Sequence, residues 1–360
     1  MSGIWTLGVL GLGEGRSIMS AALSSKSWRL GNICDLNEEL CKSRRDEFGF
    51  DRYTTRYEDM LEDPAIDVIG IYTPDQLHAL HIKMALKAGK HVICTKPLLV
   101  DLEEANDLLK VQKETGKSVF VGQSSRYFES AMQQRKDYEA GKLGELITLE
   151  THYISDSRWF LDKGWSHQKG FSWMYNFLVH PVDLAVWYLG DVQSVYAAGV
   201  TSANTKSRGI DSPDAMKVLL TNSDGLCASV NGVYASPSLP GNVQQSISCT
   251  LRGTKGVCLG GSNLSYVYKF DENGNEAHEL DLSDRWGYYY RFEGATHHAG
   301  EYQNYIEDFA AEMNAGRAAK PDLREGIRTI AVMEAIKESM SYGRAVKVQD
   351  VLDKNNIELF

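Results

Sequence analysis

Lys96 is the residue of this chain whose type and position point most directly to chemistry. It follows the apolar run at 91–95 (HVICT) and precedes Pro97. Such a run predicts a buried strand, and open α/β sheets bind their ligands at the carboxyl ends of parallel strands. A lysine in that position can hydrogen-bond the oxygen of a substrate and share its proton.

A glycine-rich turn near the N-terminus predicts a dinucleotide site. The sequence Gly11-Leu12-Gly13-Glu14-Gly15-Arg16 stands between an apolar run at 6–10 and a helix-compatible segment at 17–23. Glycines at such a turn let the backbone approach a pyrophosphate, which free N–H groups and the helix dipole stabilise. The third glycine of the G-x-G-x-x-G pattern falls on Arg16, unless the turn is one residue shorter and Gly15 takes that place. The alternative is a glycine turn that serves packing alone.

Asp35 ends the next predicted strand, twenty-four positions after Gly11. This is near the spacing of the acid that accepts hydrogen bonds from the ribose hydroxyls of NAD, and its charge repels the 2′-phosphate of NADP. We therefore expect NAD as the cofactor, with NADP less favoured and Arg16 as the residue that would favour it. Asp35 could instead cap a helix that begins near Leu36, with Glu38 completing a capping box.

The first 123 residues alternate predicted strands with predicted helices. A strand at 66–72 leads through Thr73 and Pro74 into a helix at about 75–87, and the strand with Lys96 is followed by a helix at 102–115 and a strand at 118–122. About six β-α steps predict a doubly wound parallel sheet in an α/β fold. We assign residues 1–123 to a cofactor-binding domain and 124–360 to a second domain.

The second domain begins with a predicted helix at 129–140. Apolar or alternating runs then predict strands at 146–153, 192–200, 215–220, 226–233, 243–251 and 264–270, separated by turn signals such as Asn222-Ser223-Asp224-Gly225. Two predicted helices, at about 298–315 and 323–342, end the chain.

Several short motifs follow one another along nearly the whole chain. They are Gly11-x-Gly13, Asp35, Thr73-Pro74-x-x-x-His78, Ala88-Gly89-Lys90-His91-Val92, Lys96-Pro97, Arg126-Tyr127-Phe128, Gly141-Lys142-Leu143-Gly144-Glu145, His180-Pro181-Val182-Asp183 before Leu189-Gly190, and Arg252-Gly253-Thr254-Lys255-Gly256. This set resembles the Gfo/Idh/MocA oxidoreductase family, named from glucose-fructose oxidoreductase and inositol dehydrogenase. The resemblance implies an N-terminal Rossmann domain, a C-terminal α/β domain with a large open antiparallel sheet, and hydride exchange between a nicotinamide and a secondary alcohol of a sugar or cyclitol.

The resemblance also implies which residues form the site. The expected cofactor-binding residues are Gly11, Gly13, Gly15, Arg16, Asp35, Thr73, Pro74, His78, Lys96 and Gln123. The expected catalytic residues are Lys96, His180 and Asn176, and Arg126, Asn176 and His180 are expected to contact the substrate. An imidazole that titrates near neutrality suits the general base, so we expect His180 to take the proton and Lys96 to orient the substrate oxygen. Without the family, His180 would be interpreted as a core histidine and Lys96 as a surface lysine.

The chain departs from the family pattern at two positions. Thr95 stands where the family usually has a glutamate beside the lysine, and Asn176 stands where an aspartate often precedes the histidine by four residues. Side chains four residues apart on a helix share a face, so Asn176 and His180 can reach one substrate. An asparagine can hydrogen-bond a hydroxyl but cannot take its proton. The proton transfer is therefore expected to rest on His180 and Lys96.

An aromatic segment at 153–175 predicts a wall for the substrate. It includes Tyr153, Arg158 and Trp165, and flat aromatic faces suit sugar rings or aromatic aglycones while an arginine can donate to hydroxyls. Buried contacts between domains or subunits are the alternative. A similar cluster at 285–291 (RWGYYYR), followed by His297 and His298, is expected to close the same pocket or to form a subunit interface.

Composition excludes other classes of protein. The chain has 360 residues, 43% of them hydrophobic, and a formal net charge of −10, which argues against nucleic acid as a partner. No apolar run is long enough to cross a bilayer, no basic segment precedes an N-terminal apolar stretch, and the six scattered cysteines indicate reduced thiols of a cytoplasmic protein. The nine histidines form no zinc motif, so no metal is expected. A broad sheet with one open face needs cover, which predicts a homo-oligomer through the C-terminal sheet.

These observations favour an NAD-dependent dehydrogenase that acts on a secondary hydroxyl of a sugar, glycoside or cyclitol. The aromatic wall inclines the prediction towards a glycoside, with C3 of the ring as one position that could be oxidised. Two alternatives remain open: an NAD-recycling enzyme that cleaves glycosides by oxidation and elimination, and a non-catalytic NAD-binding regulator.

Overall fold

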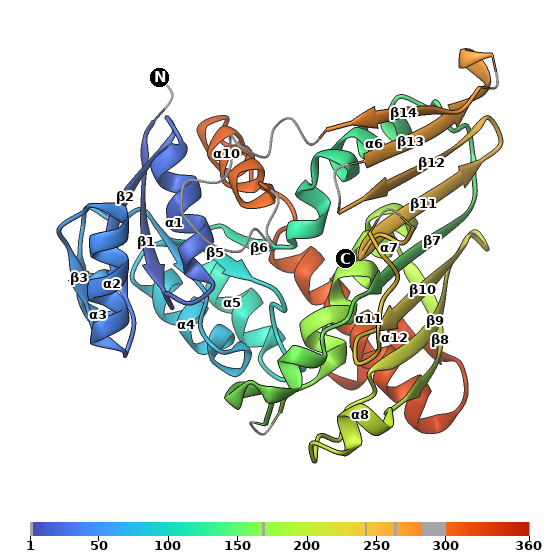
Figure 1. Ribbon diagram of the computed structural model, residues 1–360. Helices are drawn as coiled ribbons and strands as arrows, with labels where there is room; N and C mark the ends of the chain where they lie inside the picture. Colours follow the sequence, from blue (N-terminus) through green and yellow to red (C-terminus); the bar gives the residue numbers. More distant parts are fainter. Residues whose placement is uncertain are drawn as a thin grey trace. The chain divides into compact units, whose positions relative to one another are not determined.

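The computed structural model describes residues 3–167, 170–241, 243–262, 265–274, 276–282 and 300–359 (Figure 1). The described chain divides into two compact units. The first unit consists of residues up to Tyr127 together with 300–328 and Leu359, and the second consists of 128–282 and 329–358.

The first unit contains a parallel six-stranded sheet in the order β3-β2-β1-β4-β5-β6. Its strands are β1 (Trp5–Leu10), β2 (Trp28–Cys34), β3 (Tyr53–Thr54), β4 (Val68–Ile71), β5 (His91–Thr95) and β6 (Val119–Gly122). Its helices include α1 (Gly15–Ser24), α2 (Glu38–Phe48), α3 (Tyr57–Glu62), α4 (His78–Lys87) and α5 (Ala105–Thr115). Every residue of β4 and β6 is buried, as expected for parallel strands covered by helices on both faces. The predicted doubly wound sheet is confirmed.

The strand order fixes where this unit binds a ligand. The order reverses between β1 and β4, and open α/β sheets bind ligands outside the carboxyl ends of the strands at such a reversal. The glycine turn follows β1, Thr73 follows β4, and Lys96 follows β5. The sheet therefore brings the predicted cofactor residues to one edge.

Residues 300–328 were predicted to belong to the second domain, but the structure places them in the first unit. Helix α10 (Glu301–Asn314) packs against α1 through a face that buries Tyr302, Tyr305, Ile306 and Phe309. The predicted boundary at residue 123 lies close to Tyr127, where the first stretch of this unit ends. The return of the chain depends on tertiary packing, which local sequence patterns do not reveal.

The second unit contains a nine-stranded sheet in the order β14-β13-β12-β11-β7-β10-β9-β8-β15. Its strands are β7 (Leu146–Ile154), β8 (Val192–Val200), β9 (Ala215–Asn222), β10 (Cys227–Val233), β11 (Ile247–Gly253), β12 (Gly256–Gly261), β13 (Ser265–Phe270), β14 (His278–Asp281) and β15 (Val346–Lys347). The sheet was expected to be antiparallel, but β7 and β10 pair in parallel, so the sheet is mixed. The chain passes through α7 (Val179–Leu189), β8 and β9 between these two strands, and this long connection permits parallel pairing.

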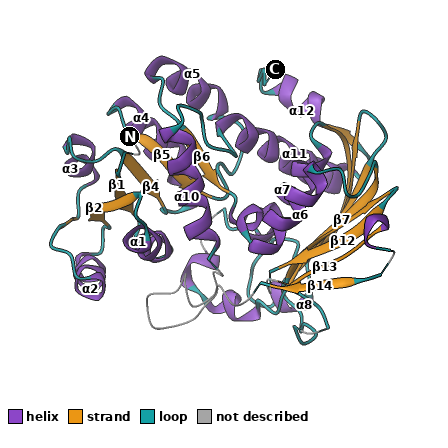
Figure 2. Ribbon diagram, turned by 90° about the horizontal axis from the view of Figure 1, so that it is seen from above, coloured by secondary structure: helices purple, strands orange, loops and turns teal. Residues whose placement is uncertain are grey.

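Helices cover one face of the nine-stranded sheet, as Figure 2 shows for α6 (Glu129–Glu139), α7 (Val179–Leu189) and α11 (Leu323–Tyr342). Leu149, Val230 and Leu220 point to the covered face and are fully buried. The neighbouring positions Glu150 and Leu219 belong to the opposite face and are exposed. The described part of the unit also contains α8 (Ala203–Lys206) and α12 (Val348–Lys354).

The residues just before α7 form an uncommon helix. The helix at Met174–Leu178, η5, has π geometry, in which the Val179 N–H donates to the Met174 carbonyl five residues earlier. Single π turns inside helices occur frequently at functional sites. This one immediately precedes His180, and the sequence pattern gives no signal for it.

Candidate active site

The glycine turn after β1 is built for close approach of a ligand. Gly11 has a φ of +87°, and a Cβ atom there would lie 2.5 Å from the Tyr72 carbonyl oxygen, so only glycine fits. A Cβ atom at Gly13 would meet nothing within 4 Å, so there is open space beside its backbone. Helix α1 begins at Gly15, where a Cβ atom would lie 2.8 Å from Val9 Cγ1, so this glycine permits close packing of helix on strand. Gly15 thus takes the third place of the pattern, one residue earlier than the usual spacing.

Asp35 holds the glycine turn in place. Its Oδ2 accepts the Leu12 N–H at 2.9 Å, and its Oδ1 accepts the Asn37 N–H at 2.9 Å. The alternative prediction that Asp35 caps the next helix is wrong, because α2 starts at Glu38 and its cap is Asn37, whose Oδ1 accepts the Leu40 N–H at 3.2 Å. Each carboxylate oxygen keeps acceptor capacity, so the residue can also bind ribose hydroxyls.

Arg16 was predicted to contact the cofactor, and the structure gives its guanidinium another partner. It forms an ion pair with Glu47, with the Nε to Oε1 distance at 2.8 Å. Glu47 also holds Arg44, whose Nη1 lies 3.0 Å from Oε2 and whose Nε donates to the Leu12 carbonyl at 3.1 Å. One glutamate therefore holds both arginines beside the glycine turn.

His78 was predicted to bind the cofactor, and the structure gives both of its ring nitrogens partners within the protein. The imidazole is fully buried, with Nδ1 at 2.7 Å from the Pro97 carbonyl oxygen and Nε2 at 2.9 Å from the Thr73 carbonyl oxygen. It therefore ties together the segments that follow β4 and β5. Thr73 and Pro74, also predicted to bind the cofactor, follow β4. The Thr73 hydroxyl lies 3.0 Å from His81 Nδ1, and Pro74 is exposed.

Lys96 lies half-buried directly after β5, preceding a cis bond to Pro97. Burial lowers the pKa of its ammonium group, whereas the negative charges of Asp75 and Glu14 oppose this shift. Thr95, where the family usually has a glutamate, shares a hydrogen bond with the Tyr302 hydroxyl from α10. The carboxylates that act on Lys96 thus belong to Asp75, after β4, and to Glu14, in the glycine turn, and not to residue 95.

Gln123 and Arg126 follow β6 in the first unit. Gln123 is buried, and its Oε1 has no donor among the described residues, so a ligand's N–H or O–H can supply one. Arg126 was predicted to contact the substrate, but its guanidinium is buried and its Nη1 lies 2.9 Å from Glu325 Oε2. That ion pair gives Arg126 a structural role in the first unit.

His180 and Asn176 lie together in the second unit, across the π turn. From Trp173 to Leu189 all residues are buried except Asn176 and Trp187, which are half-buried. The Pro181 carbonyl accepts the Thr151 hydroxyl at 2.8 Å, and this bond fastens the start of α7 to β7. Two side chains four residues apart share a face of a regular α-helix, but a π turn lies between Asn176 and His180, so their pairing on one helix face stays a prediction.

Tyr153 belongs to an aromatic cluster that covers His180. Its ring lies edge-on to the imidazole with 5.7 Å between centroids, and it also contacts Phe177 and Tyr234 at 5.4 and 5.5 Å. Burial raises the pKa of the Tyr153 hydroxyl to about 12, so it stays protonated near neutrality. Trp173 stacks on Tyr234 with 5.7 Å between centroids, and the Trp173 Nε1 and the Tyr234 hydroxyl have no partner among the described residues.

Arg158 and Trp165, the other predicted wall residues, lie further out. Arg158 is exposed and binds the Asp156 carboxylate through two nitrogens, with Nε to Oδ1 at 2.7 Å. Trp165 lies edge-on to Phe160 at 4.0 Å and close to Phe171 at 5.5 Å. The predicted cluster at 285–291 with His297 and His298 lies outside the described residues.

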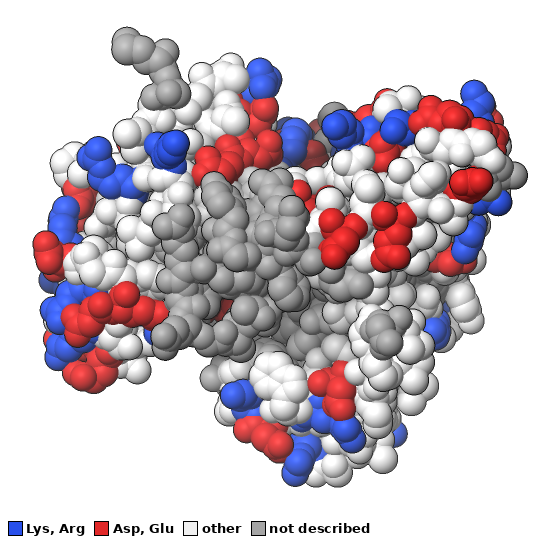
Figure 3. All heavy atoms as spheres, turned by 45° about the horizontal axis from the view of Figure 1, so that its top comes forward, with Lys and Arg blue, Asp and Glu red and all other residues white. Residues whose placement is uncertain are grey.

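The described part of the chain contains no group of three His, Cys, Asp or Glu side chains placed to hold a metal ion. On the face drawn in Figure 3, Lys and Arg side chains are interspersed with Asp and Glu, so this face presents no extended basic surface. Among the described helices, none is long and apolar enough to span a bilayer. All six cysteines are free, and five of them are buried.

Comparison with known proteins agrees with this geometry. Residues 6–123 match the NAD-binding Rossmann fold of the GFO_IDH_MocA oxidoreductase family, and residues 135–348 match the C-terminal alpha/beta domain of the same family. A doubly wound dinucleotide-binding unit followed by a unit with a large mixed sheet defines the class. The chain belongs to the Gfo/Idh/MocA family of oxidoreductases and carries its NAD-binding domain.

Individual relatives are distant but span the whole chain. Levoglucosan dehydrogenase of Pseudarthrobacter phenanthrenivorans is 24% identical over 94% of this chain and 96% of its own length. Inositol 2-dehydrogenase of Rhizobium meliloti is 24% identical over 95% of this chain and 98% of its own. The solved structure of levoglucosan dehydrogenase in complex with NADH and levoglucosan superposes with a TM-score of 0.82 at 21% identity, covering 95% of this chain and 98% of that one. These relatives act on a sugar derivative and a cyclitol.

Proposed function

We propose that the protein is an NAD-dependent dehydrogenase that oxidises a secondary hydroxyl of a sugar, glycoside or cyclitol, or reduces the corresponding ketone. The observation that carries the proposal is Lys96, half-buried with a lowered pKa at the carboxyl end of β5, on the same sheet edge as the glycine turn. The names of the relatives support the class of substrate.

The first unit supplies the groups that hold the cofactor. Gly11 permits the turn, Gly13 leaves room for a pyrophosphate and Gly15 lets the helix pack on its strand, while Asp35 presents acceptors to the ribose and Gln123 offers a buried acceptor. Asp35 also favours NAD over NADP, since its charge repels a 2′-phosphate and Glu47 holds the two nearby arginines. When NAD is bound, its nicotinamide accepts the hydride of the alcohol carbon.

Lys96 orients the substrate oxygen and shares its proton. Because burial lowers its pKa, a larger fraction of the side chain is the neutral amine near pH 7 than for an exposed lysine. In either form the Lys96 nitrogen can hydrogen-bond the substrate oxygen and share the proton that His180 takes. The negative charges of Asp75 and Glu14 oppose this lowering of the pKa.

His180 is the main general base in this proposal, and Asn176 binds a substrate hydroxyl beside it. The aromatic cluster excludes water from the imidazole on the side of Tyr153, which strengthens any hydrogen bond formed there. Asn176 cannot take a proton, so it contributes orientation only.

Steady-state kinetics on a panel of sugars, glycosides and cyclitols test these roles. We expect His180→Ala and Lys96→Met to lower kcat by about 10²–10⁴, the usual contribution of a positioned acid or base, while each variant still binds NADH. Lys87→Met, which removes an exposed lysine from α4, is the control and should retain activity. Turnover close to wild type in either site variant would remove its assigned role.

A further inference from the structure

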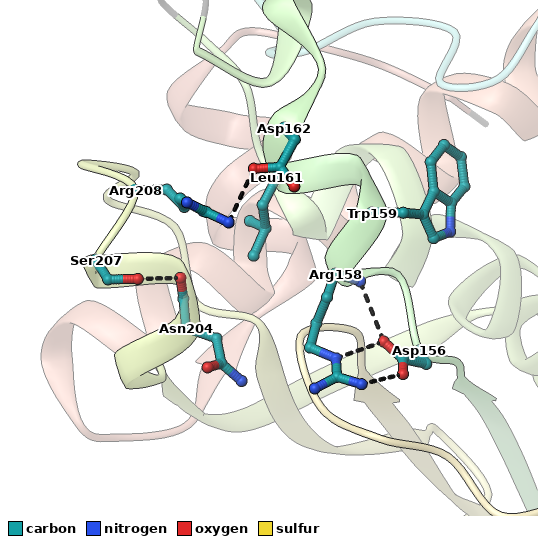
Figure 4. Close-up of a pocket in the computed structure, with 8 residues that line it drawn as sticks. All are labelled: Asp156, Arg158, Trp159, Leu161, Asp162, Asn204, Ser207 and Arg208. Carbon is teal, nitrogen blue, oxygen red and sulfur yellow. Dashed lines mark hydrogen bonds and ion pairs between the residues drawn. The ribbon is translucent and has the colours of Figure 1, made fainter.

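The second unit contains a polar cavity that the proposed chemistry does not use. It has a volume of about 710 Å³ and opens between η3 (Arg158–Asp162) and α8. Its lining residues are Asp156, Arg158, Trp159, Leu161, Asp162, Asn204, Ser207 and Arg208, drawn in Figure 4. The volume is within the range of about 300–1,000 Å³ that small-molecule sites occupy.

The charges in this cavity cancel. Arg158 pairs with Asp156, and Arg208 pairs with Asp162 through an Nη2 to Oδ1 distance of 2.9 Å. Figure 4 shows the two pairs on different sides of the cavity, each arginine turned towards its aspartate. Two positive and two negative groups favour neither an anion nor a cation, but they offer donors and acceptors side by side. A hydroxyl can accept from a guanidinium and donate to a carboxylate at the same time.

Further polar groups border the same space. The Asn204 Nδ2 donates to the Ala235 carbonyl at 2.7 Å, and its Oδ1 has no donor among the described residues. The Ser207 hydroxyl donates to the Asn204 backbone carbonyl at 2.9 Å and can still accept a hydrogen bond. In Figure 4 both residues lie on the side of Arg208. This side therefore presents an amide, a hydroxyl and an ion pair together.

The walls of the cavity are fixed by bonds within the unit. Asp156 pairs with Ala235 in an isolated antiparallel bridge, and the next residue, Ser157, donates its N–H to the Tyr234 carbonyl at 2.8 Å. On the other wall, buried Asp214 accepts the Ser202 N–H at 3.0 Å and the hydroxyls of Ser202 and Thr205, which anchors α8 to β9. A ligand would therefore meet polar groups that are already in position, which lowers the entropy cost of binding.

One residue of η3 links the cavity wall to the aromatic cluster over His180. Phe160 lies within the η3 turn and packs edge-on against Phe177 with 5.1 Å between ring centroids. Phe177 adjoins Asn176 in the π turn. The outer side of η3 thus lines the cavity, and its inner side contacts the helix that carries the proposed base.

We propose that this cavity is a subsite for a neutral polyhydroxylated ring, the part of a glycoside or oligosaccharide that is not oxidised. The proposal rests on the proposed function, because it names the glycosides among the three substrate classes. A free monosaccharide or cyclitol has no second ring to place there. Trp159, 59% exposed at the rim beside Arg158, adds an apolar face of the kind that sugar rings contact.

Calorimetric titration of the full-length protein with NADH present tests the subsite. The probes are cellobiose and maltose, with methyl β-glucoside as the one-ring reference and glucose 6-phosphate as the anionic reference. We expect at least one disaccharide to bind about tenfold more tightly than methyl β-glucoside, the effect of one or two added hydrogen bonds to charged groups. Glucose 6-phosphate should bind no better than methyl β-glucoside, because the cavity carries no excess positive charge.

Two variants assign the effect to the cavity. Arg208→Gln and Asn204→Ala should each weaken disaccharide binding by about tenfold. Arg52→Gln is the matched control, since Arg52 is 59% exposed and pairs with Asp63 at 2.7 Å, much as Arg208 is 50% exposed and pairs with Asp162. Disaccharides that bind no more tightly than methyl β-glucoside, or variants that bind them like the wild type, would overturn the proposal.

Failure of the subsite can be separated from failure of the proposed function. Reduction of NAD by a monosaccharide or cyclitol without any preference for disaccharides would reject the subsite and leave the dehydrogenase proposal intact. Variant-sensitive disaccharide binding without turnover of any panel member would support the subsite and reject the dehydrogenase proposal.

Discussion

At the scale of single residues, the structure explains how Lys96 can work without a neighbouring glutamate. The carboxylates that act on its charge are Asp75 and Glu14, while Thr95 is bound to Tyr302. The electrostatic role of the missing acid is thus distributed over residues distant in sequence. Spacing along the chain alone does not predict this arrangement.

Asp75 should tune the pH dependence of the reaction. Its negative charge raises the pKa of Lys96 against the lowering effect of burial, so Asp75→Asn should lower that pKa further. If the neutral amine is the working form, the acidic limb of the kcat profile moves to lower pH. Asp107→Asn, on the exposed side of α5, is the control. An unchanged or upward-shifted limb in Asp75→Asn would contradict the assignment.

Glu47 should control the choice between NAD and NADP. It holds Arg16 and Arg44, which could otherwise bind a 2′-phosphate. Glu47→Gln should therefore improve the Kd for NADPH relative to NADH by about five- to tenfold, the effect of one charge-assisted hydrogen bond. Glu62→Gln, at the end of α3, provides the control for loss of one negative charge. An unaltered ratio of the two dissociation constants would show that Asp35 alone sets the preference.

At the scale of elements, the sequence predicted most helices and strands but not all of their details. Apolar periodicity located β1, β2, β4, β5 and β6, because buried parallel strands give continuous apolar runs. Strands β3 and β15 were missed because two residues are too few for a pattern, β14 because it is polar, and β12 because half of its residues are glycines. The predicted helix at 75–87 is a 3-10 turn at Asp75–Leu77 followed by α4.

The candidate site shows the same division. Gly11, Gly13, Asp35 and Lys96 were predictable because their types and spacing are set by the strands that precede them. The contacts of His78 were not predictable, since two carbonyl groups from separate segments define them. The π turn before His180 was also not predictable, because it depends on the packing of Trp173, Phe177 and Tyr234.

His91, in strand β5, should lower the free energy of unfolding of the protein at acid pH. The imidazole Nδ1 accepts the Ser118 N–H at 3.0 Å, which requires an unprotonated nitrogen, and burial lowers the His91 pKa to about 4. The unfolded chain takes up this proton near its ordinary pKa of 6.5, so the folded state loses stability as the pH falls from 6.5 to 4. With solvent screening of a half-buried ring taken into account, the loss is about 1–2 kcal/mol.

Urea unfolding between pH 4 and 7.5 measures this effect. His91→Gln keeps an acceptor for Ser118 without a titrating ring, so its free energy of unfolding should fall less steeply with acid than that of the wild type. The two proteins should differ least in slope above pH 6.5, where the ring is neutral in both states. Parallel curves over the whole range would exclude His91 as the source.

At the scale of the whole molecule, the open face of the nine-stranded sheet predicts self-association. Leu219, 45% exposed, and its cross-strand neighbour Tyr196, 49% exposed, lie on this face. Light scattering at micromolar concentration should therefore give at least twice the 40.2 kDa of one chain. Leu219→Arg should shift the mass towards the monomer, whereas Leu239→Arg, at a loop position 57% exposed, should not. A monomeric wild type would contradict the prediction.

NAD binding and the oxidation of a secondary hydroxyl can be tested in one experiment. It consists of mass analysis of the small molecules released from the purified protein, followed by absorbance in the reduced-nicotinamide band while sugars, glycosides and cyclitols are added. We expect the protein to bind NAD, carried through purification or added, and at least one compound to raise this absorbance in the wild type but not in Lys96→Met. A protein that releases no nicotinamide and binds none, or one that binds NAD and shows no change in absorbance with any compound, would contradict this expectation.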